Sequence, residues 1–387
     1  MNTKFYFISA LASMALLSGC SDNELASVET SQKTPIGFHT VGSQMGSRAT
    51  IITPSNLQDT DFKVYAFTDK GEEFLGTKDT DYGTNGIHIH HNGTKWDYKT
   101  PTDLSYWPGT VTPLNFFAVN PATFDSDLAM NYTWKINDKE QKIWYWCVDE
   151  YGGGTGKNID VMYAIANNQT KNTNSGTVKM KFRHILSQIA FQAKTQDATI
   201  EVEIEDIKLF NLGMSGHFTF PENDQKQPTK ANWEPTDIAS GAAFNVIKGA
   251  KASVTNAAIT KITNDETNTK TMLVIPQKLK AWQTSAASPK TKADADNDKE
   301  SYLGINCKIK LNGKYVKGSK DEYEFLYVPF KAEWEPGKRY VYTLIFGGGY
   351  TDKGIPVMNP VNFDAEVTDW VEDENNTTTG NDVITQQ

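Results

Sequence analysis

Apolar residues alternate with polar ones in many short runs along the chain. The clearest runs lie at residues 62–67, 178–182, 200–204, 340–346 and 363–367. This spacing predicts strands with one buried face and one solvated face. No window combines a helical period with capping residues, so we expect at most one or two short helices. The pattern therefore indicates a mostly β protein, and the aromatic content of 11% agrees with it.

The sequence predicts one hairpin directly. The alternating residues 307–311 lead into Asn312-Gly313 and leave through 314–316. Both central residues of a type I′ turn take a positive φ, which Asn and Gly tolerate, so this pair favours a tight two-residue connection.

Polar stretches suggest how the chain is divided. Residues 167–176 contain no apolar side chain, and they predict a boundary between an N-terminal domain at 49–175 and a C-terminal domain at 176–370. A second polar stretch, 283–300, is interpreted as a long surface loop of the second domain. Residues 371–387 form a polar tail.

The N-terminus has the features of a bacterial lipoprotein signal. Lys4 precedes a short apolar run at 5–17, and Leu17-Ser18-Gly19-Cys20 ends in a cysteine suited to acylation. We interpret 1–19 as the signal peptide and Cys20 as the lipidated residue. The run is too short for a spanning helix. The alternative is an ordinary secretory leader with an incidental cysteine.

Residues 20–48 are small and polar apart from a patch at 36–38, so we expect a propeptide or linker and no core element. Only Arg48, Arg183 and Arg339 are arginines among 38 basic residues. A protease that reads the planar guanidinium distinguishes them from lysine. Arg183 and Arg339 lie in strand patterns, so one cut is predicted, between Arg48 and Ala49. The alternative is a solvated linker arginine without a role.

The charge of the chain bears on its binding partners, and its cysteine content bears on disulfide bonds. The net charge is −9, from 47 acidic and 38 basic residues without a basic block, which argues against nucleic acid as a partner. Cys147 and Cys307 are the remaining cysteines. Two separate thiols are favoured over one bridge, because a disulfide needs close, correctly directed Cβ atoms.

Two glycine-containing motifs resemble catalytic loops but depart from them. Residues 152–157 resemble a phosphate-binding loop, yet Tyr151 stands where the first glycine belongs. Residues 213–217 resemble a nucleophile elbow, yet His217 stands where the last glycine belongs. Turns between strands account better for both, and we expect no catalytic and no cofactor-binding residues.

Two clusters have a partial metal-binding pattern. Asp294, Asp296 and Asp298 have the spacing that opens a calcium loop, but the required Gly and closing Glu are absent. His88, His90 and His91 would place two imidazoles on one strand face, without the further ligands that fix zinc. A solvated loop and an exposed hairpin are the favoured interpretations, so no metal site is expected. Weak calcium binding at the aspartates stays open.

Several stretches together resemble the fimbrillin family, the Mfa-like and fimbrillin A-like pilins of Bacteroidales. They cover most of residues 49–370 in the family's order. The matching stretches are Tyr106-Trp107-Pro108, 114–118, 160–164, 178–189, Ile275-Pro276-Gln277, 334–342 and 367–370.

This resemblance implies two transthyretin-like β-sandwich domains in tandem after a lipoprotein signal and propeptide. It also implies a lipoprotein precursor at the cell outer membrane, maturation by an arginine-specific protease and assembly with other pilin subunits into an extracellular pilus. In the family, removal of the N-terminal strand opens a groove that an extended segment of a neighbour fills. Physically, this is strand addition to an exposed sheet edge. A host or bacterial surface ligand stays open as a further partner.

The sequence departs from the simplest pilin pattern at its C-terminus. The candidate donor segment, 371–387, has no apolar residue between 372 and 380. A tip or accessory subunit, or a donor that begins within 364–371, therefore stays open beside a stalk subunit. The alternative function is an outer-surface lipoprotein that binds glycans for nutrient uptake through the aromatic residues Trp96, Trp107, Trp144, Trp146 and Trp282.

Overall fold

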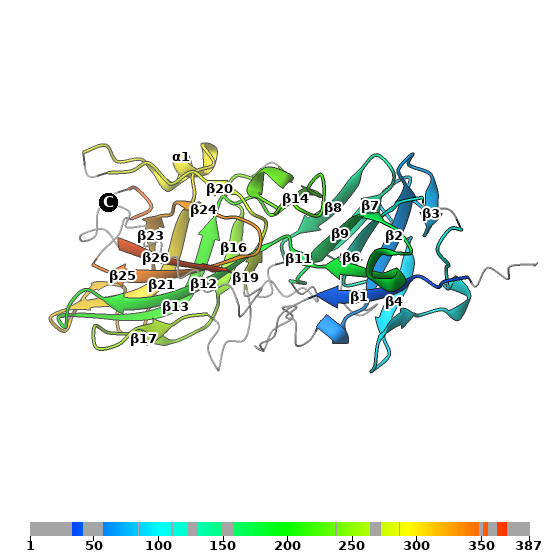
Figure 1. Ribbon diagram of the computed structural model, residues 1–387. Coiled ribbons are helices and arrows are strands. Elements are labelled where there is room, and N and C mark those ends of the chain that lie inside the picture. The colour runs from blue at the N-terminus through cyan, green and yellow to red at the C-terminus, as the bar shows by residue number, and fades with distance from the viewer. Residues whose placement is uncertain are drawn as a thin grey trace, which may run out of the picture. The chain divides into compact units, whose positions relative to one another are not determined.

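The computed structural model describes residues 33–41, 57–83, 85–109, 112–122, 131–148, 158–236, 238–263, 272–285, 287–347, 351–354 and 362–369. Within these ranges the chain forms 26 strands and a single α-helix (Figure 1). The predicted all-β class is confirmed, and so are the five strands expected from alternation. No helix of the described ranges is long and apolar enough to cross a membrane.

The largest sheet has nine strands in the order β10-β1-β5-β4-β2-β6-β9-β11, with β3 attached to β2. Its strands are β1 (Gly37–Val41), β2 (Phe62–Thr68), β3 (Glu73–Leu75), β4 (Ile87–His91), β5 (Trp96–Tyr98), β6 (Leu114–Asn120), β9 (Met162–Gln169), β10 (Thr177–Lys181) and β11 (Arg183–His184). Only Phe182 separates β10 from β11, so the two ends of the order meet and the sheet closes on itself. Phe62, Phe116 and Met180 lie in the apolar cluster that fills its interior.

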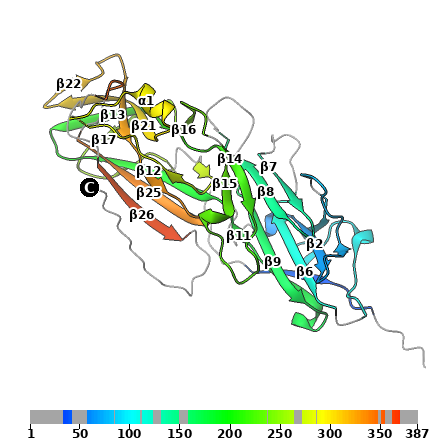
Figure 2. The ribbon, with the colours of Figure 1, turned by 90° about the horizontal axis from the view of Figure 1, so that it is seen from above.

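The opposite face of this sheet packs against a second sheet of four strands, β15-β14-β8-β7 (Figure 2). These strands are β7 (Tyr132–Ile136), β8 (Gln141–Trp146), β14 (Ser215–Thr219) and β15 (Trp233–Pro235). Tyr65 on β2 and Trp134 on β7 are fully buried between the sheets. The Trp134 indole donates to the Tyr65 hydroxyl at 2.7 Å, and that hydroxyl donates to Asp79 at 2.8 Å.

The C-terminal part is built from a five-stranded and a six-stranded sheet. The first contains β12 (Ser187–Thr195), β18 (Thr260–Lys261), β19 (Met272–Val274), β25 (Lys338–Phe346) and β26 (Asn362–Asp369). The second contains β13 (Ile200–Phe210), β16 (Ala243–Ile247), β17 (Ala252–Val254), β21 (Tyr302–Leu311), β22 (Lys314–Lys317) and β23 (Glu324–Pro329). Alternate residues of β12, β13, β21 and β25 are buried in one apolar cluster. β20 (Lys278–Leu279) and β24 (Ala332–Glu333) form a separate pair.

The hairpin prediction is confirmed. β21 and β22 pair across Asn312 and Gly313, whose φ angles are 51° and 75°. Both central residues thus take the positive φ of a type I′ turn.

The expectation of a long surface loop at 283–300 is wrong for part of this stretch, because α1 (Lys292–Asn297) lies within it. Thr291 caps this helix by accepting a hydrogen bond from the Asp294 amide at 3.1 Å. Lys292 pairs with Asp296 one turn later at 2.8 Å. A capping box and an i,i+4 ion pair stabilise even a short helix.

Hydrogen-bonded sheets extend across the expected boundary at residues 175 and 176. β10 and β11 join the first sheet, while β14 and β15 join the second. The division into 49–175 and 176–370 therefore stays a prediction, and any separation into two domains has to divide these shared sheets.

Candidate functional site

The segment before the expected cleavage point contains a strand that is built into the first sheet. β1 pairs in parallel with β10 over five residues, from Gly37 opposite Thr177 to Val41 opposite Lys181. On its other side only Phe38 pairs with β5, opposite Trp96. The expectation that residues 20–48 contribute no core element is wrong for residues 36–41.

Alternate side chains of this segment point into the closed sheet. Ile36 and Phe38 are 1% and 5% exposed, whereas His39 is exposed. The Phe38 ring packs edge-on against Phe62 and Phe116, with ring centroids 6.1 Å and 6.2 Å apart. Full burial of one such apolar side chain contributes about 1.5–3 kcal/mol. The alternation of Ile36, Phe38 and Thr40 was the sequence signal for this strand, but it spans too few residues to distinguish a strand from a linker.

Side chains from β5 secure the backbone of β1 on the side where the ladder is short. The Tyr98 hydroxyl donates to the Ile36 carbonyl at 3.1 Å, and the Trp96 indole donates to the Thr40 hydroxyl at 2.9 Å. Burial raises the pKa of Tyr98 to about 12. Upstream of β1, the Ile36 amide donates to the Ser105 carbonyl at 2.9 Å.

Loss of β1 would leave two strand edges, those of β10 and β5, without a partner. The vacated space would be lined by apolar side chains from β2, β5, β6 and β10. The arrangement has what strand addition requires, namely main-chain groups for a ladder and pockets for alternate side chains. The segment 36–41 and the side chains around it are therefore the candidate assembly site.

The predicted lipidation and maturation residues cannot be placed against this site. Cys20, Arg48 and Ala49 lie outside the described residues, as does the tail 371–387. Arg183 and Arg339 lie in β11 and β25, as the sequence predicted.

The structure shows the surroundings of both remaining cysteines. Cys147 and Cys307 are free and buried, so the favoured interpretation of two separate thiols is confirmed. Burial raises the pKa of each thiol to about 12.

The candidate metal ligands bind protein donors. Asp294 accepts from Thr291, Asp296 from Asn211 at 3.0 Å, and Asp298 from Lys290 at 2.6 Å. His88 pairs with Asp61 at 2.8 Å. Among the described residues there is no group of three or more side chains arranged to hold a metal ion.

The two loops that resembled catalytic motifs have different outcomes. Residues 213–217 enter β14, where the Ser215 hydroxyl lies 2.6 Å from that of Thr236 and no helix follows as an elbow requires. Most of the phosphate-loop candidate at 152–157 lies outside the described residues.

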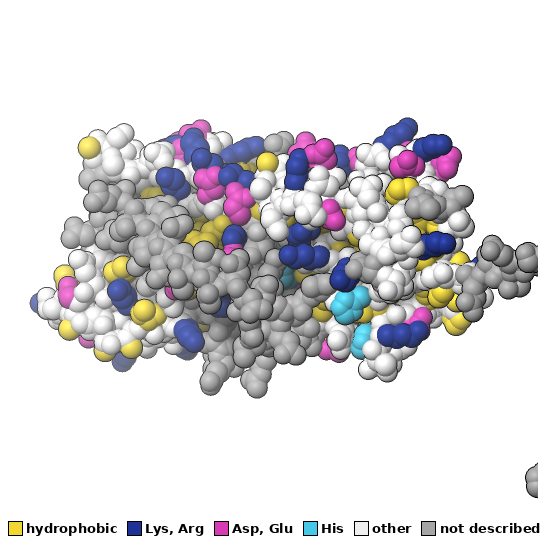
Figure 3. Space-filling view, in the orientation of Figure 1, with side chains coloured by type: hydrophobic (Ala, Val, Ile, Leu, Met, Phe, Trp, Pro, Cys, Tyr) yellow, Lys and Arg dark blue, Asp and Glu magenta, His cyan; other side chains and the backbone are white. Residues whose placement is uncertain are grey.

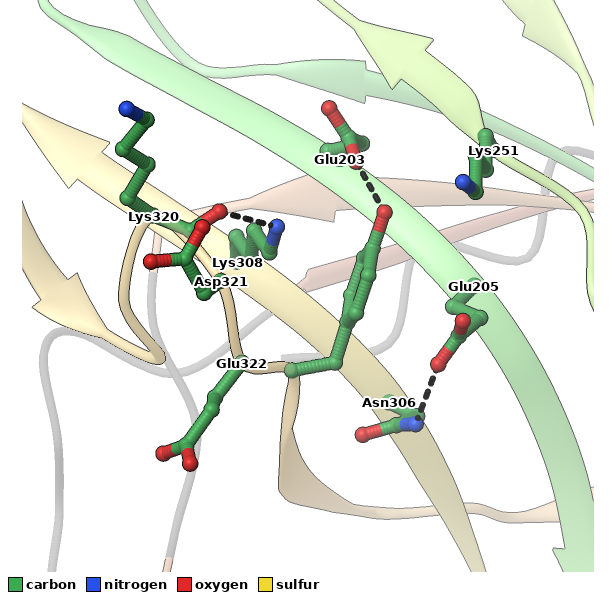
Figure 4. Close-up of a pocket in the computed structure, with 9 residues that line it drawn as sticks. Glu203, Glu205, Lys251, Asn306, Lys308, Lys320, Asp321 and Glu322 are labelled. Atoms are coloured by element: carbon green, nitrogen blue, oxygen red, sulfur yellow. Dashed lines mark hydrogen bonds between the residues drawn. The ribbon is translucent and has the colours of Figure 1, made fainter.

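A polar hollow of about 750 Å³ lies over β13 and β21 in the C-terminal part (Figure 4). Its groups pair largely with one another: the Tyr323 hydroxyl binds Glu203, and Asn306 donates to Glu205 at 3.0 Å. Lys308 lies 4.2 Å from the Tyr323 ring centre and donates to the Lys320 carbonyl at 2.7 Å. The hydrogen bond to Glu203 raises the pKa of Tyr323 to about 12. Because these polar groups bind one another, their presence in the hollow is explained without a ligand, and the hollow is not taken as the functional site.

The surface charge is mixed. Lysine and acidic side chains are interspersed over the face shown in Figure 3. A mixed face lacks the single-sign field that attracts a polyanion.

These features define a class: an all-β protein whose N-terminal strand fills a gap between two strand edges. The sequence matches the fimbrillin-like family over residues 47–370, and the chain belongs to that family.

The individual proteins that match this chain have low sequence identity to it. The fimbrium subunit Fim1C of Phocaeicola vulgatus is 27% identical over 208 residues, which are 51% of this chain and 52% of that protein. The chain thus spans about half the length of this curated relative. A crystal structure of a fimbrial protein from Bacteroides vulgatus aligns with a TM-score of 0.55 at 15% identity, over 87% of this chain and 99% of that one. The tip fimbrial protein Mfa3 of Porphyromonas gingivalis aligns with a TM-score of 0.36 at 10% identity, over 80% and 94%.

Proposed function

We propose that this chain is a non-enzymatic subunit of an adhesive fimbrium that assembles by strand exchange. It is exported as a lipoprotein through Cys20 to the outer membrane, and an arginine-specific protease cuts it after Arg48. The cut separates β1 from the remainder of the chain. A segment of a neighbouring subunit then takes the place of β1, and the assembled fimbrium is extracellular.

The placement of β1 is the observation that carries this proposal. Its backbone is in a ladder, its alternate side chains are buried, and it precedes Arg48 in the chain. A strand that is both part of the fold and upstream of a single cut can be exchanged without unfolding the remainder. Because an incoming strand would restore the same ladder and burial, the exchanged state is stabilised by equivalent contacts.

The proposed donor is the tail at 371–387. Residues 362–369 pair with β25 along their whole length, so a donor within them would first have to leave that ladder. The tail has few apolar side chains to fill the groove. This composition favours a tip or accessory position over a stalk position.

An arginine-specific protease tests the proposal. The full chain and an Arg48→Lys variant, both in membranes, are treated with the protease and followed by N-terminal sequencing, membrane release and gel analysis without boiling. For the natural chain we expect a new N-terminus at Ala49, release from the membrane and loss of the 20–48 fragment. The lysine variant keeps the charge and should remain intact.

The products at later times after protease treatment distinguish a stalk subunit from a tip or accessory subunit. Multimers that resist detergent indicate a strand-exchanging stalk subunit, because a buried ladder dissociates slowly. A lasting monomer that has lost the fragment indicates a tip or accessory subunit. Absence of the cut, or a 20–48 fragment that stays bound after it, would contradict the proposal.

A further inference from the structure

A cluster of aromatic rings occupies the outer face of the four-stranded sheet. Its members, called the ring cluster here, are Tyr82, Trp144, Trp146 and His217. Trp144 and His217 are direct cross-strand neighbours on β8 and β14, and their rings stack with centroids 6.1 Å apart and planes at 22°. Trp146 lies 5.1 Å from Trp144. All four side chains are partly exposed, so their rings are accessible from solvent.

Tyr82 reaches the ring cluster from the loop between β3 and β4. This loop runs along β7, the edge strand on the side of β8 away from β14. The Tyr82 hydroxyl lies 2.7 Å from His217 Nδ1, and its ring centre lies 6.4 Å from that of Trp144. The loop is held firmly: the amides of Asp79 and Gly83 donate to carbonyls of β7, both at 2.9 Å. The buried hydrogen bond from Tyr65 to the Asp79 carboxylate adds a third attachment. The ring cluster is therefore preorganised, which lowers the entropy lost when a ligand binds.

We propose that the ring cluster binds hexopyranose units of a neutral polysaccharide. One face of a pyranose ring consists of C–H groups with a weak positive charge, and aromatic ring faces are negative. Sugar hydroxyls need polar partners beside the rings. The Tyr82 hydroxyl and the second nitrogen of His217 supply them. The indole N–H of Trp144 is buried without an acceptor, so a shift that admits a hydroxyl would satisfy it.

The surrounding charges favour a neutral ligand. Glu140 lies between Lys135 and Lys142 at 3.1 Å and 2.8 Å, and Glu234 is the cross-strand neighbour of His217. Asp81 adjoins Tyr82 and adds a third carboxylate, so three carboxylates stand against two ammonium groups. The single excess negative charge disfavours an acidic polymer and is too small to select a basic one.

The same composition argues against a protein as the ligand. Charged side chains are depleted from the centres of protein interfaces, where aromatic residues dominate. Here the rings are directly bordered by ion pairs and by Thr133 and Thr219. The apolar centre is therefore small for a stable protein interface, which buries about 800 Å² on each partner. A sugar chain contacts only the rings and the polar atoms beside them.

Native gel electrophoresis through soluble polysaccharide tests the proposal. The full chain is run in gels containing neutral galactan, β-glucan or mannan, in gels containing acidic pectin, and in plain gels. We expect at least one neutral polymer to retard it. Trp146→Ala and Tyr82→Ala should each weaken that binding roughly three- to tenfold, the range expected for loss of one aromatic contact. Tyr82→Phe keeps the ring but loses the hydroxyl, so its binding should lie between that of the natural chain and that of Tyr82→Ala.

Tyr315→Ala is the matched control, since Tyr315 is 39% exposed on β22, far from the ring cluster in sequence and in a different sheet. It should bind as the natural chain does. Thermal unfolding of each variant verifies that it is folded.

Retardation by none of the neutral polymers, or by pectin alone, would overturn the proposal. Equal loss in Tyr315→Ala would overturn it as well. Unchanged retardation in folded Trp146→Ala and Tyr82→Ala would overturn it too, and reduced self-association of these variants would assign the ring cluster to a protein contact instead. The test is independent of Arg48 and of strand exchange, so it can fail while the proposed function stands.

Discussion

The Tyr98 hydroxyl donates a hydrogen bond of 3.1 Å to the carbonyl oxygen of Ile36. This bond joins β5 to the residue just before β1, on the side where the two strands share a single ladder pair. Release of β1 therefore requires that a buried tyrosine lose its acceptor. The strand is secured by side chains on one edge and by backbone pairing on the other.

We predict that Tyr98→Phe loosens β1. Loss of one such hydrogen bond costs about 0.5–1.5 kcal/mol. Hydrogen exchange of residues 36–41 should accelerate more than exchange in β12 or β13. Tyr132→Phe is the matched control, because the Tyr132 hydroxyl donates to the Pro121 carbonyl at 2.9 Å, away from β1. Faster exchange of β1 in both variants, or in neither, would show that Tyr98 does not secure it.

The burial of the Tyr98 hydroxyl predicts a pH dependence. Burial raises the pKa of Tyr98 to about 12, from a usual value near 10. A raised folded-state pKa contributes stability that is complete below pH 10 and is lost as the pH rises toward 12. Base catalysis accelerates amide exchange at every residue as the pH rises. After correction for this rise, exchange at residues 36–41 should still accelerate over that interval in the natural chain. In Tyr98→Phe this contribution is absent, so the difference between the two chains should shrink as the pH rises.

Phe38→Ala tests how much the strand contributes to the fold. The ring is buried against Phe62, Tyr98 and Phe116, and removal of a buried phenylalanine ring costs about 3–5 kcal/mol. Thermal or urea unfolding should show this loss in the uncut chain. His39→Ala changes the next residue, which is exposed, and should stay within about 0.5 kcal/mol of the natural chain.

After cleavage the same two variants should differ in a second assay, the rate at which the 20–48 fragment is lost. If β1 is exchanged, weaker binding of β1 makes it leave sooner, so Phe38→Ala should lose the 20–48 fragment faster than His39→Ala. Equal rates of fragment loss would mean that Phe38 does not limit release.

The strands that sequence alone predicts are those whose alternation spans five or more residues. Residues 200–204 and 340–346 repeat it often enough that burial of one face is the only reasonable explanation. β1 was missed because Ile36 and Phe38 are two apolar residues in a polar stretch. Their burial depends on β10, which lies about 140 residues later. Pairing at such separation has no local signature.

The short helix α1 and the ring cluster show two further reasons why a sequence alone does not predict a structure completely. The capping pair Thr291 and Asp294 was visible, but six residues give too little periodicity to identify α1. The sequence suggested Trp144 and Trp146 as surface aromatics together with Trp96, Trp107 and Trp282, and the last three are buried. Which tryptophans face solvent is decided by strand register, and nothing local linked Tyr82 to His217, 135 residues away.

Because Arg183 and Arg339 lie in paired strands, we predict that both are protected from proteolysis in the folded chain. Arg183 is 4% exposed on β11, and its guanidinium donates to the Asp224 carbonyl at 2.7 Å. Arg339 is paired on both sides, with β12 and with β26. In Arg48→Lys, an arginine-specific protease should cut neither bond in the folded chain and both after denaturation. Peptide mass analysis of the two digests distinguishes these outcomes. A native cut at either site would mean that its sheet opens locally.

The reactivity of the three cysteine thiols provides a last prediction, which tests the proposed lipid anchor together with the fold. Cys147 and Cys307 are buried, and desolvation raises the pKa of each to about 12, so almost no thiolate forms near neutral pH. Since the thiolate is the reactive form, neither should react with a thiol reagent in the folded protein. After denaturation both should react at once.

The number of thiols in the denatured chain reports on Cys20. The sequence has three cysteines, and a diacylglyceryl group joined to the Cys20 sulfur by a thioether would remove one thiol from the count. We expect two reactive thiols in the membrane-bound protein. Cys20→Ala should also give two, but without membrane attachment. Three thiols in the natural chain would show that Cys20 is unmodified and that the signal is an ordinary secretory leader, so the lipid anchor would have to be abandoned while the assignment of β1 to strand exchange would not.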